Sequence, residues 1–129
     1  MKSFEDAKIL IVDDMPSVQR MIGKMLESFG AQFIIYASNG SMALEMIHNA
    51  STPIDLILCD WNMPIMTGIE LLREVKSDDR YKKIPFIMVT AEGEKQKIIE
   101  AITLGVNQYI TKPIERDNLR RKIEHFFPV

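Results

Sequence analysis

Five short apolar runs, separated by segments with helical patterning, constrain the fold more than any other feature of the chain. The runs span residues 9–12, 33–36, 56–59, 86–89 and 106–110. Those at 9–12, 56–59 and 86–89 are apolar throughout, which is typical of parallel strands covered on both faces. The alternation therefore predicts an α/β fold of the (βα)5 kind, in which a doubly wound, five-stranded parallel sheet carries helices on both faces.

The segments between these runs have apolar residues at helical spacing, with signals for where each helix begins and ends. Pro16 suits the first turn of the first helix and Gly30 its end, while Ser41 is a candidate N-cap for the second. Gly105 ends the fourth pattern and Pro128 the fifth. We expect helices at residues 18–29, 41–48, 69–75, 98–104 and 119–127.

Composition and charge limit the classes of function. The 129 residues suit one domain spanning 1–129, and the formal net charge of -2 comes from interleaved acids and bases. Because there is no basic stripe and no apolar run long enough to span a bilayer, neither nucleic acid nor a membrane is expected as a direct partner. Residues 1–6 have acids where a signal peptide needs an apolar core, so we expect a cytoplasmic protein.

Chemically useful side chains follow four of the apolar runs. Asp13 and Asp14 come after the first run, Asp60 after the third, Thr90 after the fourth and Lys112 after the fifth. Right-handed crossovers bring the carboxyl ends of parallel strands to one edge of a sheet, where ligands bind, so we expect these residues to meet. Each has an ordinary interpretation as a helix cap, strand residue or surface lysine, but their co-occurrence favours a common site.

Three clustered carboxylates require positive charge. Two carboxylates about 4 Å apart repel by roughly 4 kcal/mol at an effective dielectric of about 20, so the cluster must bind a cation or take up protons. Ligation by oxygen alone, without His or Cys, favours Mg²⁺. The sequence therefore predicts a magnesium site formed by Asp13, Asp14 and Asp60.

An ordered set of motifs over nearly the whole chain resembles the response-regulator receiver domain, with the greatest similarity to its chemotaxis members. The motifs are Asp13-Asp14 after Ile9-Leu10-Ile11-Val12, Asp60-Trp61-Asn62-Met63-Pro64 with Gly68, Thr90-Ala91-Glu92, and Tyr109 before Lys112-Pro113. The resemblance implies the flavodoxin-like strand order 2-1-3-4-5. It also implies a two-component signalling switch, whose only chemistry is its own phosphorylation and dephosphorylation, rather than an enzyme.

The resemblance implies roles for individual residues at the strand ends. Asp60 would accept a phosphoryl group from a histidine kinase of the CheA kind, while Thr90 and Lys112 would contact the transferred group. The ligands of the metal would be Asp13, Asp14, Asp60 and the backbone carbonyl of Asn62. Asn62 and Glu92 would tune the rate of dephosphorylation. The bond Lys112-Pro113 resembles the cis peptide of the family, although X-Pro bonds are trans by default.

The resemblance also implies a switch that transmits phosphorylation to a partner. Thr90 would bind the phosphoryl group and leave space into which Tyr109 turns. This movement would alter the face formed by helix 98–104, strand 106–110 and helix 119–127, where a flagellar motor switch protein or another output protein would bind. We expect a monomer that acts with this partner, the kinase and a possible phosphatase.

Two other classes share part of this pattern. A haloacid dehalogenase-like phosphatase also has a nucleophilic aspartate at a strand end, but it needs an acid two residues later, where this chain has Asn62. A flavodoxin-like cofactor binder needs glycine and hydroxyl residues in its first loop, whereas the acids of 13–15 would repel a phosphate.

The output within the receiver class is also open. Ile114 stands where chemotaxis members usually have Phe, and Glu94 brings an acid where they often have a base. A receiver that regulates an output other than the motor is therefore the alternative. The ending at 126–129 has no linker, which favours a free-standing messenger over a domain of a longer protein.

Overall fold

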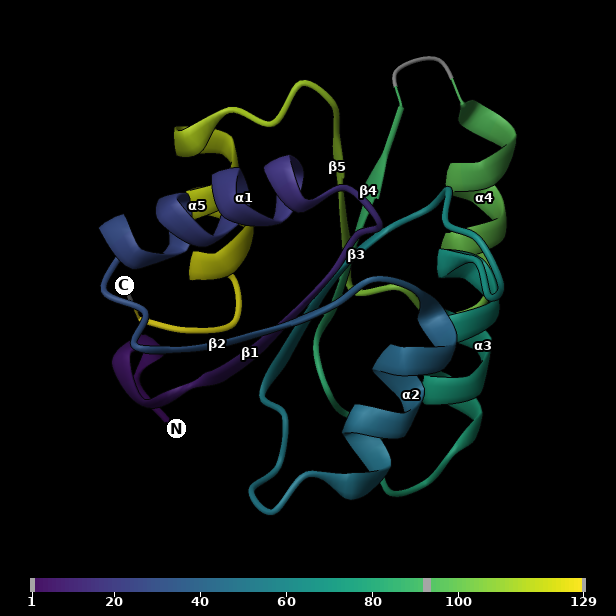
Figure 1. Cartoon of the computed structure of the whole chain (residues 1–129). Coiled ribbons are helices and arrows are strands. Elements are labelled where there is room, and N and C mark those ends of the chain that lie inside the picture. The colour runs from purple at the N-terminus through teal and green to yellow at the C-terminus, as the bar shows by residue number, and fades with distance from the viewer. Residues whose placement is uncertain (1, 92–93, 129) are drawn as a thin grey trace.

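The computed structural model describes residues 2–91 and 94–128, in which strands and helices alternate (Figure 1). The strands are β1 (Lys8–Val12), β2 (Phe33–Ala37), β3 (Leu56–Asp60), β4 (Phe86–Thr90) and β5 (Gln108–Thr111). The helices are η1 (Phe4–Asp6), which is a 3-10 turn, and α1 (Pro16–Ser28), α2 (Gly40–Asn49), α3 (Gly68–Ser77), α4 (Lys95–Thr103) and α5 (Arg116–Glu124). This order confirms the predicted (βα)5 alternation.

The described strands form one parallel sheet in the order β2-β1-β3-β4-β5. Helices α1 and α5 cover one face of the sheet, and α2, α3 and α4 cover the other (Figure 1). This arrangement confirms the doubly wound α/β fold and the strand order 2-1-3-4-5 that the resemblance implied.

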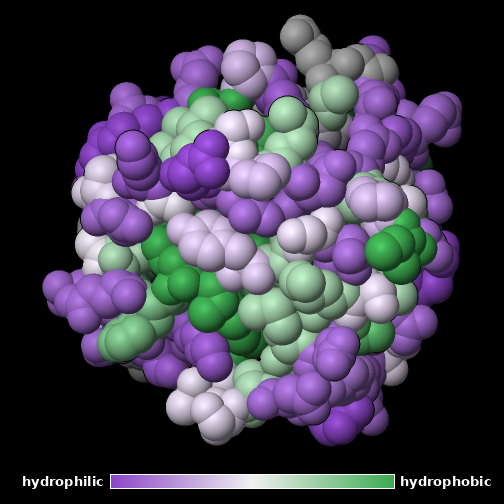
Figure 2. Space-filling model, in the orientation of Figure 1, coloured by the Kyte–Doolittle hydropathy of each residue, from purple (hydrophilic) through white to green (hydrophobic). Residues whose placement is uncertain are grey.

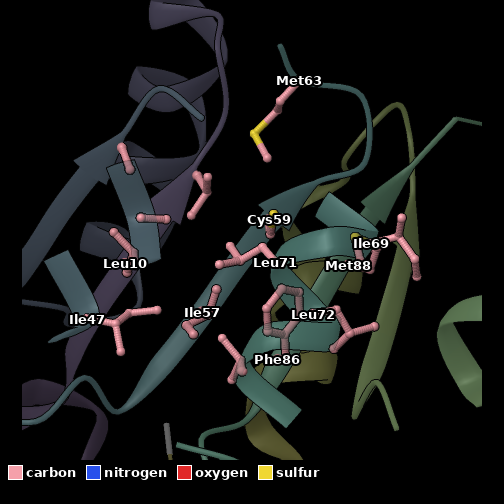
Figure 3. Close-up of a cluster of buried hydrophobic side chains, with 14 of the residues drawn as sticks. Leu10, Ile47, Ile57, Cys59, Met63, Ile69, Leu71, Leu72, Phe86 and Met88 are labelled. Atoms are coloured by element: carbon pink, nitrogen blue, oxygen red, sulfur yellow. The ribbon is translucent and has the colours of Figure 1, made fainter. Parts of the chain in front are cut away.

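Side chains of the central strands alternate between two apolar clusters, one on each face of the sheet. On β1, Ile9 and Ile11 pack in the cluster that includes α1 and α5, whereas Leu10 and Val12 pack in the cluster that includes α2 and α3. Figure 3 shows the second cluster, in which side chains of β1, β3 and β4 meet leucines of α3. Because both faces of these strands are buried, their sequences are apolar throughout.

The two edge strands are less buried. Phe33 and Tyr36 of β2 are exposed, and only Ile110 of β5 is buried among residues 108–111. In Figure 2, hydrophobic residues gather in the middle of the viewed face, within a largely hydrophilic surround. None of the described helices combines the length and the apolar character needed to cross a membrane.

The fifth strand begins at Gln108 rather than at residue 106, so its predicted start was wrong. The N–H of Val106 donates to Ala101 O and the N–H of Gly105 to Ile102 O, each at 3.0 Å, which closes the end of α4. Gly105 has φ +94, as this kind of helix end requires. Val106 therefore belongs to the helix end, and its apolar side chain packs against the cluster of α2 and α3 without forming part of the strand.

The predicted cap of the second helix was also wrong. Helix α2 begins at Gly40, and Asn39 Oδ1 accepts the N–H of Met42 at 2.8 Å, so Asn39 is the N-cap and Ser41 lies inside the first turn. Both residue types make good caps, and the periodicity of apolar residues does not choose between neighbouring positions.

Candidate functional site

Strands β1 and β3 are hydrogen-bonded neighbours, so the acids at their carboxyl ends lie side by side. Carboxylate oxygens of Asp13, Asp14 and Asp60 lie within 4.8 Å of one another. Asp13 and Asp60 are only 1% and 6% exposed, whereas Asp14 is exposed. The structure therefore brings together the three acids that the sequence placed at one edge of the sheet.

Asp13 has one oxygen with a partner and one without. Oδ1 accepts the N–H of Met15 at 2.8 Å, while Oδ2 is buried and has no hydrogen-bond partner in residues 2–91 and 94–128. Burial raises the pKa of Asp13; the Met15 hydrogen bond and Lys112 oppose this rise, whereas the charges of Asp60 and Asp14 add to it. A buried oxygen of this kind is costly unless a donor or a cation reaches it.

Lys112 brings positive charge to the acids. Its Nζ lies 3.2 Å from Asp60 Oδ1, and its N–H donates to Thr90 O at 2.8 Å, which continues the pairing of β4 and β5 beyond Thr111. The Lys112-Pro113 peptide bond is cis, the form that the resemblance implied.

Thr90 and Tyr109 lie in different surroundings. Thr90 ends β4 with its side chain buried, and its Oγ1 donates to Ala91 O at 3.0 Å. Tyr109 is 36% exposed on β5, and Lys122 Nζ lies 5.5 Å from the centre of its ring. Thr90 therefore belongs to the strand-end site, while Tyr109 lies at the surface.

The loop after β3 is packed closely against the backbone of Asp60. A Cβ at Gly68 would collide with Asp60 O, and the N–H of Gly68 donates to Trp61 O at 2.9 Å. Thr67 and Glu70 form a capping box that starts α3 directly after the loop. This packing explains why a glycine belongs to the motif. Asn62, two residues after Asp60 in the same loop, is exposed.

Two contacts in the site had no signal in the sequence. Gln19 Nε2 donates to Asp13 O at 2.7 Å and to Ala37 O at 3.3 Å, which ties the ends of β1 and β2 together. Lys97 Nζ donates to Asn62 Oδ1 at 3.2 Å. Both side chains come from helices, and polar residues in an amphipathic pattern look like a solvated helix face.

Three other positions that the sequence singled out differ in their surroundings. Glu92 lies outside the described residues, so its place near Asn62 stays a prediction. Ile114 is 8% exposed and packs in the cluster of α1 and α5, so the substitution for Phe lies in the core. Glu94 Oε2 lies 3.0 Å from Lys97 Nζ, an ion-pair distance without the alignment of a hydrogen bond.

A hollow of about 480 Å³ lies away from the acids, along the edge strand β2, where Lys8, Phe33 and Pro53 are among its lining residues. No residue of the strand-end site lines it. We therefore take the three acids as the candidate functional site. The clustered charges and the unpartnered oxygen lie there, and the residues that line the hollow form no comparable cluster of acids.

The strand-end arrangement suits phosphoryl chemistry. A buried carboxylate next to an ammonium can act as a nucleophile toward phosphorus, and adjacent carboxylates can hold a hard divalent cation. Asp60 has the first environment, and Asp13 and Asp14 supply the second.

Comparisons with known proteins agree with this geometry. The response regulator receiver domain family matches residues 9–124. The chain is 46% identical over 120 residues to the chemotaxis protein CheY of Pseudomonas aeruginosa, across 93% of this chain and 95% of that protein. It resembles the crystal structure of the chemotaxis response regulator CheY4 of Vibrio cholerae with a TM-score of 0.82 and 32% identity, over 92% of this chain and 97% of that one.

A third similarity concerns the metal. The receiver domain of a sensor histidine kinase from Pseudomonas aeruginosa, solved with a magnesium ion coordinated in its active site cleft, matches with a TM-score of 0.82. It is 28% identical, over 93% of this chain and 96% of that one. The family match, the relatives and the fold together lead to one conclusion: the chain belongs to the response regulator receiver domain family of two-component signalling and is close to CheY.

Proposed function

We propose that Asp60 accepts a phosphoryl group from a histidine kinase in a Mg²⁺-dependent reaction, and that this switches the protein between two signalling states. The observation that carries the proposal is the buried acid cluster: Asp60 contacts the Lys112 ammonium, and the neighbouring Asp13 keeps a buried oxygen without a partner among the described residues. The function is that of a signalling switch. Asn62, rather than an acid, stands two residues after Asp60, which disfavours the phosphatase alternative.

The donor set fits Mg²⁺. Asp13, Asp14 and Asp60 offer oxygens alone, and the buried Oδ2 of Asp13 is a ligand atom in need of a cation. The backbone carbonyl of Asn62 would complete the protein ligands. When bound, the ion would neutralise charge on the acids and on the equatorial oxygens of the transferred group.

The residues of this chain divide the transfer between them. An Asp60 oxygen attacks the phosphorus of the phosphohistidine, the bond between phosphorus and the imidazole nitrogen breaks, and the electron pair remains on that nitrogen. Lys112, already 3.2 Å from Asp60 Oδ1, neutralises charge that builds on the phosphoryl oxygens. The packing of Gly68 on Asp60 keeps the acceptor in place.

The readout begins at Thr90. In this structure its hydroxyl donates to Ala91 O, and Tyr109 is exposed. After phosphorylation the Thr90 hydroxyl would instead donate to the phosphoryl group, and its movement would open a space into which Tyr109 turns. The affected face is α4-β5-α5, where Ile99 and Ile102 are 57% exposed. Its partner is a flagellar motor switch protein or another output protein, and the chemotaxis names of the relatives support the former.

The wider setting follows the same family logic. We infer a monomer that is one domain over 1–129, works in the cytoplasm, takes its phosphoryl group from a CheA-like kinase, and has no direct contact with nucleic acid or a membrane. Loss of the group, alone or with a phosphatase, would be tuned by Asn62 and Glu92.

Phosphorylation without the kinase tests the proposal. The protein would be incubated with acetyl phosphate, with and without Mg²⁺, and phosphoprotein measured by mass spectrometry while Trp61 fluorescence is recorded. We expect a Mg²⁺-dependent mass gain and fluorescence change in wild type and neither in Asp60→Asn. Equal incorporation of phosphoryl groups into Asp60→Asn would reject Asp60 as the acceptor. Equal incorporation with and without Mg²⁺ would reject the requirement for the metal.

A further inference from the structure

The side chain of Lys97, on α4, contacts the loop that follows the acceptor. Its Nζ donates to Asn62 Oδ1 at 3.2 Å, lies 3.0 Å from Glu94 Oε2, and lies 5.5 Å from the centre of the Trp61 ring. The side chains of Lys97 and Glu94 are only 33% and 28% exposed, so the ammonium is partly withdrawn from water. One cation thus has three neighbours beside the phosphorylation site.

The contact with Lys97 fixes what Asn62 offers to its surroundings. An ammonium can only donate hydrogen bonds, so the atom of Asn62 that it contacts must be the carbonyl oxygen. The amide of Asn62 is then held with its oxygen toward α4, and its NH₂ group is the part left to face other partners. In this orientation one of the two lone pairs of the Asn62 oxygen is used by Lys97, and the amide turns its donor group to other partners.

We propose that Lys97 is a positioning residue that acts through Asn62 to slow hydrolysis of the phosphoryl group on Asp60, an inference that rests on the proposed function. In hydrolysis the oxygen of a water forms a bond to phosphorus, the bond from phosphorus to the Asp60 oxygen breaks, and Asp60 regains its carboxylate. The water gives up a proton, which leaves with inorganic phosphate. A group that accepts a hydrogen bond from this water orients its lone pair toward phosphorus and assists the attack.

Lys97 withholds such an acceptor because it holds the carbonyl oxygen of Asn62 toward α4 and uses one of its lone pairs. Without the ammonium, the Asn62 amide would be free to turn its oxygen to the water, and hydrolysis would be faster. Trp61 is 6% exposed and packs beneath the ammonium, so the lysine chain has a fixed surface to lie on. The pair is partly exposed, which limits the expected effect to that of a modest ion pair or hydrogen bond.

The test compares the lifetimes of the phosphoryl group. Each protein is phosphorylated with acetyl phosphate and Mg²⁺, the donor is removed by gel filtration into buffer that contains Mg²⁺, and the loss of phosphoprotein is followed by mass spectrometry. Lys97→Met, which keeps the length of the side chain, should shorten the lifetime about twofold to fivefold. Lys97→Arg, which keeps a charged donor, should restore most of it. The matched control is Lys95→Met, a substitution of an exposed lysine in the same helix, which should leave the lifetime unchanged.

A double-mutant cycle separates positioning from general charge. In an Asn62→Ala background, Lys97→Met should have no further effect on the lifetime, because the residue through which it acts is gone. An unchanged lifetime in Lys97→Met, or the same shortening in both backgrounds, would overturn the inference while leaving the proposed function intact. A wild type that takes up no phosphoryl group would overturn the proposed function first, and the inference with it.

Discussion

The two ends of the sheet differ in how their polar groups are partnered. At the amino ends of the strands, Lys76 Nζ donates to Lys82 O, Ile84 O and Asn107 Oδ1 at 2.7 to 3.0 Å, and the same Asn107 oxygen accepts the N–H of Phe86 at 2.9 Å. At the carboxyl ends, Asp13 keeps an unpartnered buried oxygen among the described residues, beside two further acids. The chain itself supplies the hydrogen-bond partners at the amino end, whereas at the carboxyl end a buried acceptor oxygen has none within the described residues.

Backbone conformation shows the same contrast. The helices that lead into β2 and β5, at the amino ends of the strands, stop at Gly30 and Gly105, whose φ angles are +106 and +94. In the loop after β3, at the carboxyl end, Ile65 has φ +68 with 81% of its side chain exposed. A β-branched residue in this region is unfavourable, and such residues concentrate at functional sites. The helix ends at the amino end of the sheet therefore use glycine and avoid strain, whereas the strained residue lies at the carboxyl end, beside the proposed site.

The largest expected effect comes from removing a hydrogen-bond acceptor at the amino ends of the strands. Asn107→Ala removes one of the three hydrogen-bond acceptors of the Lys76 ammonium and leaves the Phe86 N–H without its side-chain acceptor, and should lower the free energy of unfolding by about 2 kcal/mol. Urea unfolding checks this, with the exposed Asn49→Ala as the matched control, expected to change stability by less than about 0.5 kcal/mol. A loss below about 0.5 kcal/mol would mean that the network contributes little to stability.

The next effect has the opposite sign and concerns Asp13. Because the pKa of Asp13 is raised in the folded state, the stability due to its protonated form is complete below about pH 4 and is lost as the pH rises through the folded pKa. Asp13→Asn abolishes this loss and removes the charge from a buried, unpartnered oxygen, so the metal-free variant should be more stable than wild type near neutral pH, by the cost of one unsatisfied buried group, roughly 1 to 2 kcal/mol. Unfolding in EDTA across pH should show the two proteins converging in acid; a difference that grows in acid would refute the assignment.

The backbone contrast predicts two smaller effects of opposite direction. Ile65→Asn should raise the free energy of unfolding by about 1 kcal/mol, because Asn tolerates a positive φ. Gly30→Ala should lower it by about 1 kcal/mol, because a side chain is strained at φ +106. Thermal unfolding of both variants decides; a destabilised Ile65→Asn would show that Ile65 makes a compensating contact.

The smallest effect concerns the corrected helix cap. Asn39→Ala should destabilise the protein by about 0.5 to 1 kcal/mol, because the N–H of Met42 loses its acceptor. Ser41→Ala, the cap that the apolar pattern predicted, should change stability by no more than a few tenths of a kcal/mol, about the scatter of surface substitutions. A larger loss of stability in Ser41→Ala than in Asn39→Ala, measured by chemical unfolding, would support Ser41 as the N-cap.

Burial explains which parts of the fold could be predicted. The central strands have both faces covered, so their apolar runs marked them clearly, with Leu10 and Ile11 packing on opposite faces. The start of β5 could not be placed, because Val106 closes the end of α4 while its apolar side chain packs in the core like that of a strand residue. The strand order came from the resemblance, since the alternation of elements indicates a layered α/β fold without ranking the strands.

The candidate site shows a similar division. The acids could be located from the sequence because topology alone carries strand ends to one edge. Gln19 and Lys97 could not, since their contacts depend on how helices are placed against the sheet. The unpartnered Asp13 oxygen is likewise a result of three-dimensional packing and has no counterpart in the motif.

The central claim is that the acid cluster is incomplete without a divalent cation, and the effect of Mg²⁺ on stability tests it most directly. The melting temperatures of wild type and Asp13→Asn would be measured over a series of Mg²⁺ concentrations, with the chelated proteins as references. We predict that Mg²⁺ raises the melting temperature of wild type. The corresponding gain in the free energy of unfolding is about 2.7 kcal/mol when free Mg²⁺ exceeds Kd a hundredfold, and the variant should gain little or nothing. Equal rises in both proteins, or none in wild type, would contradict the account.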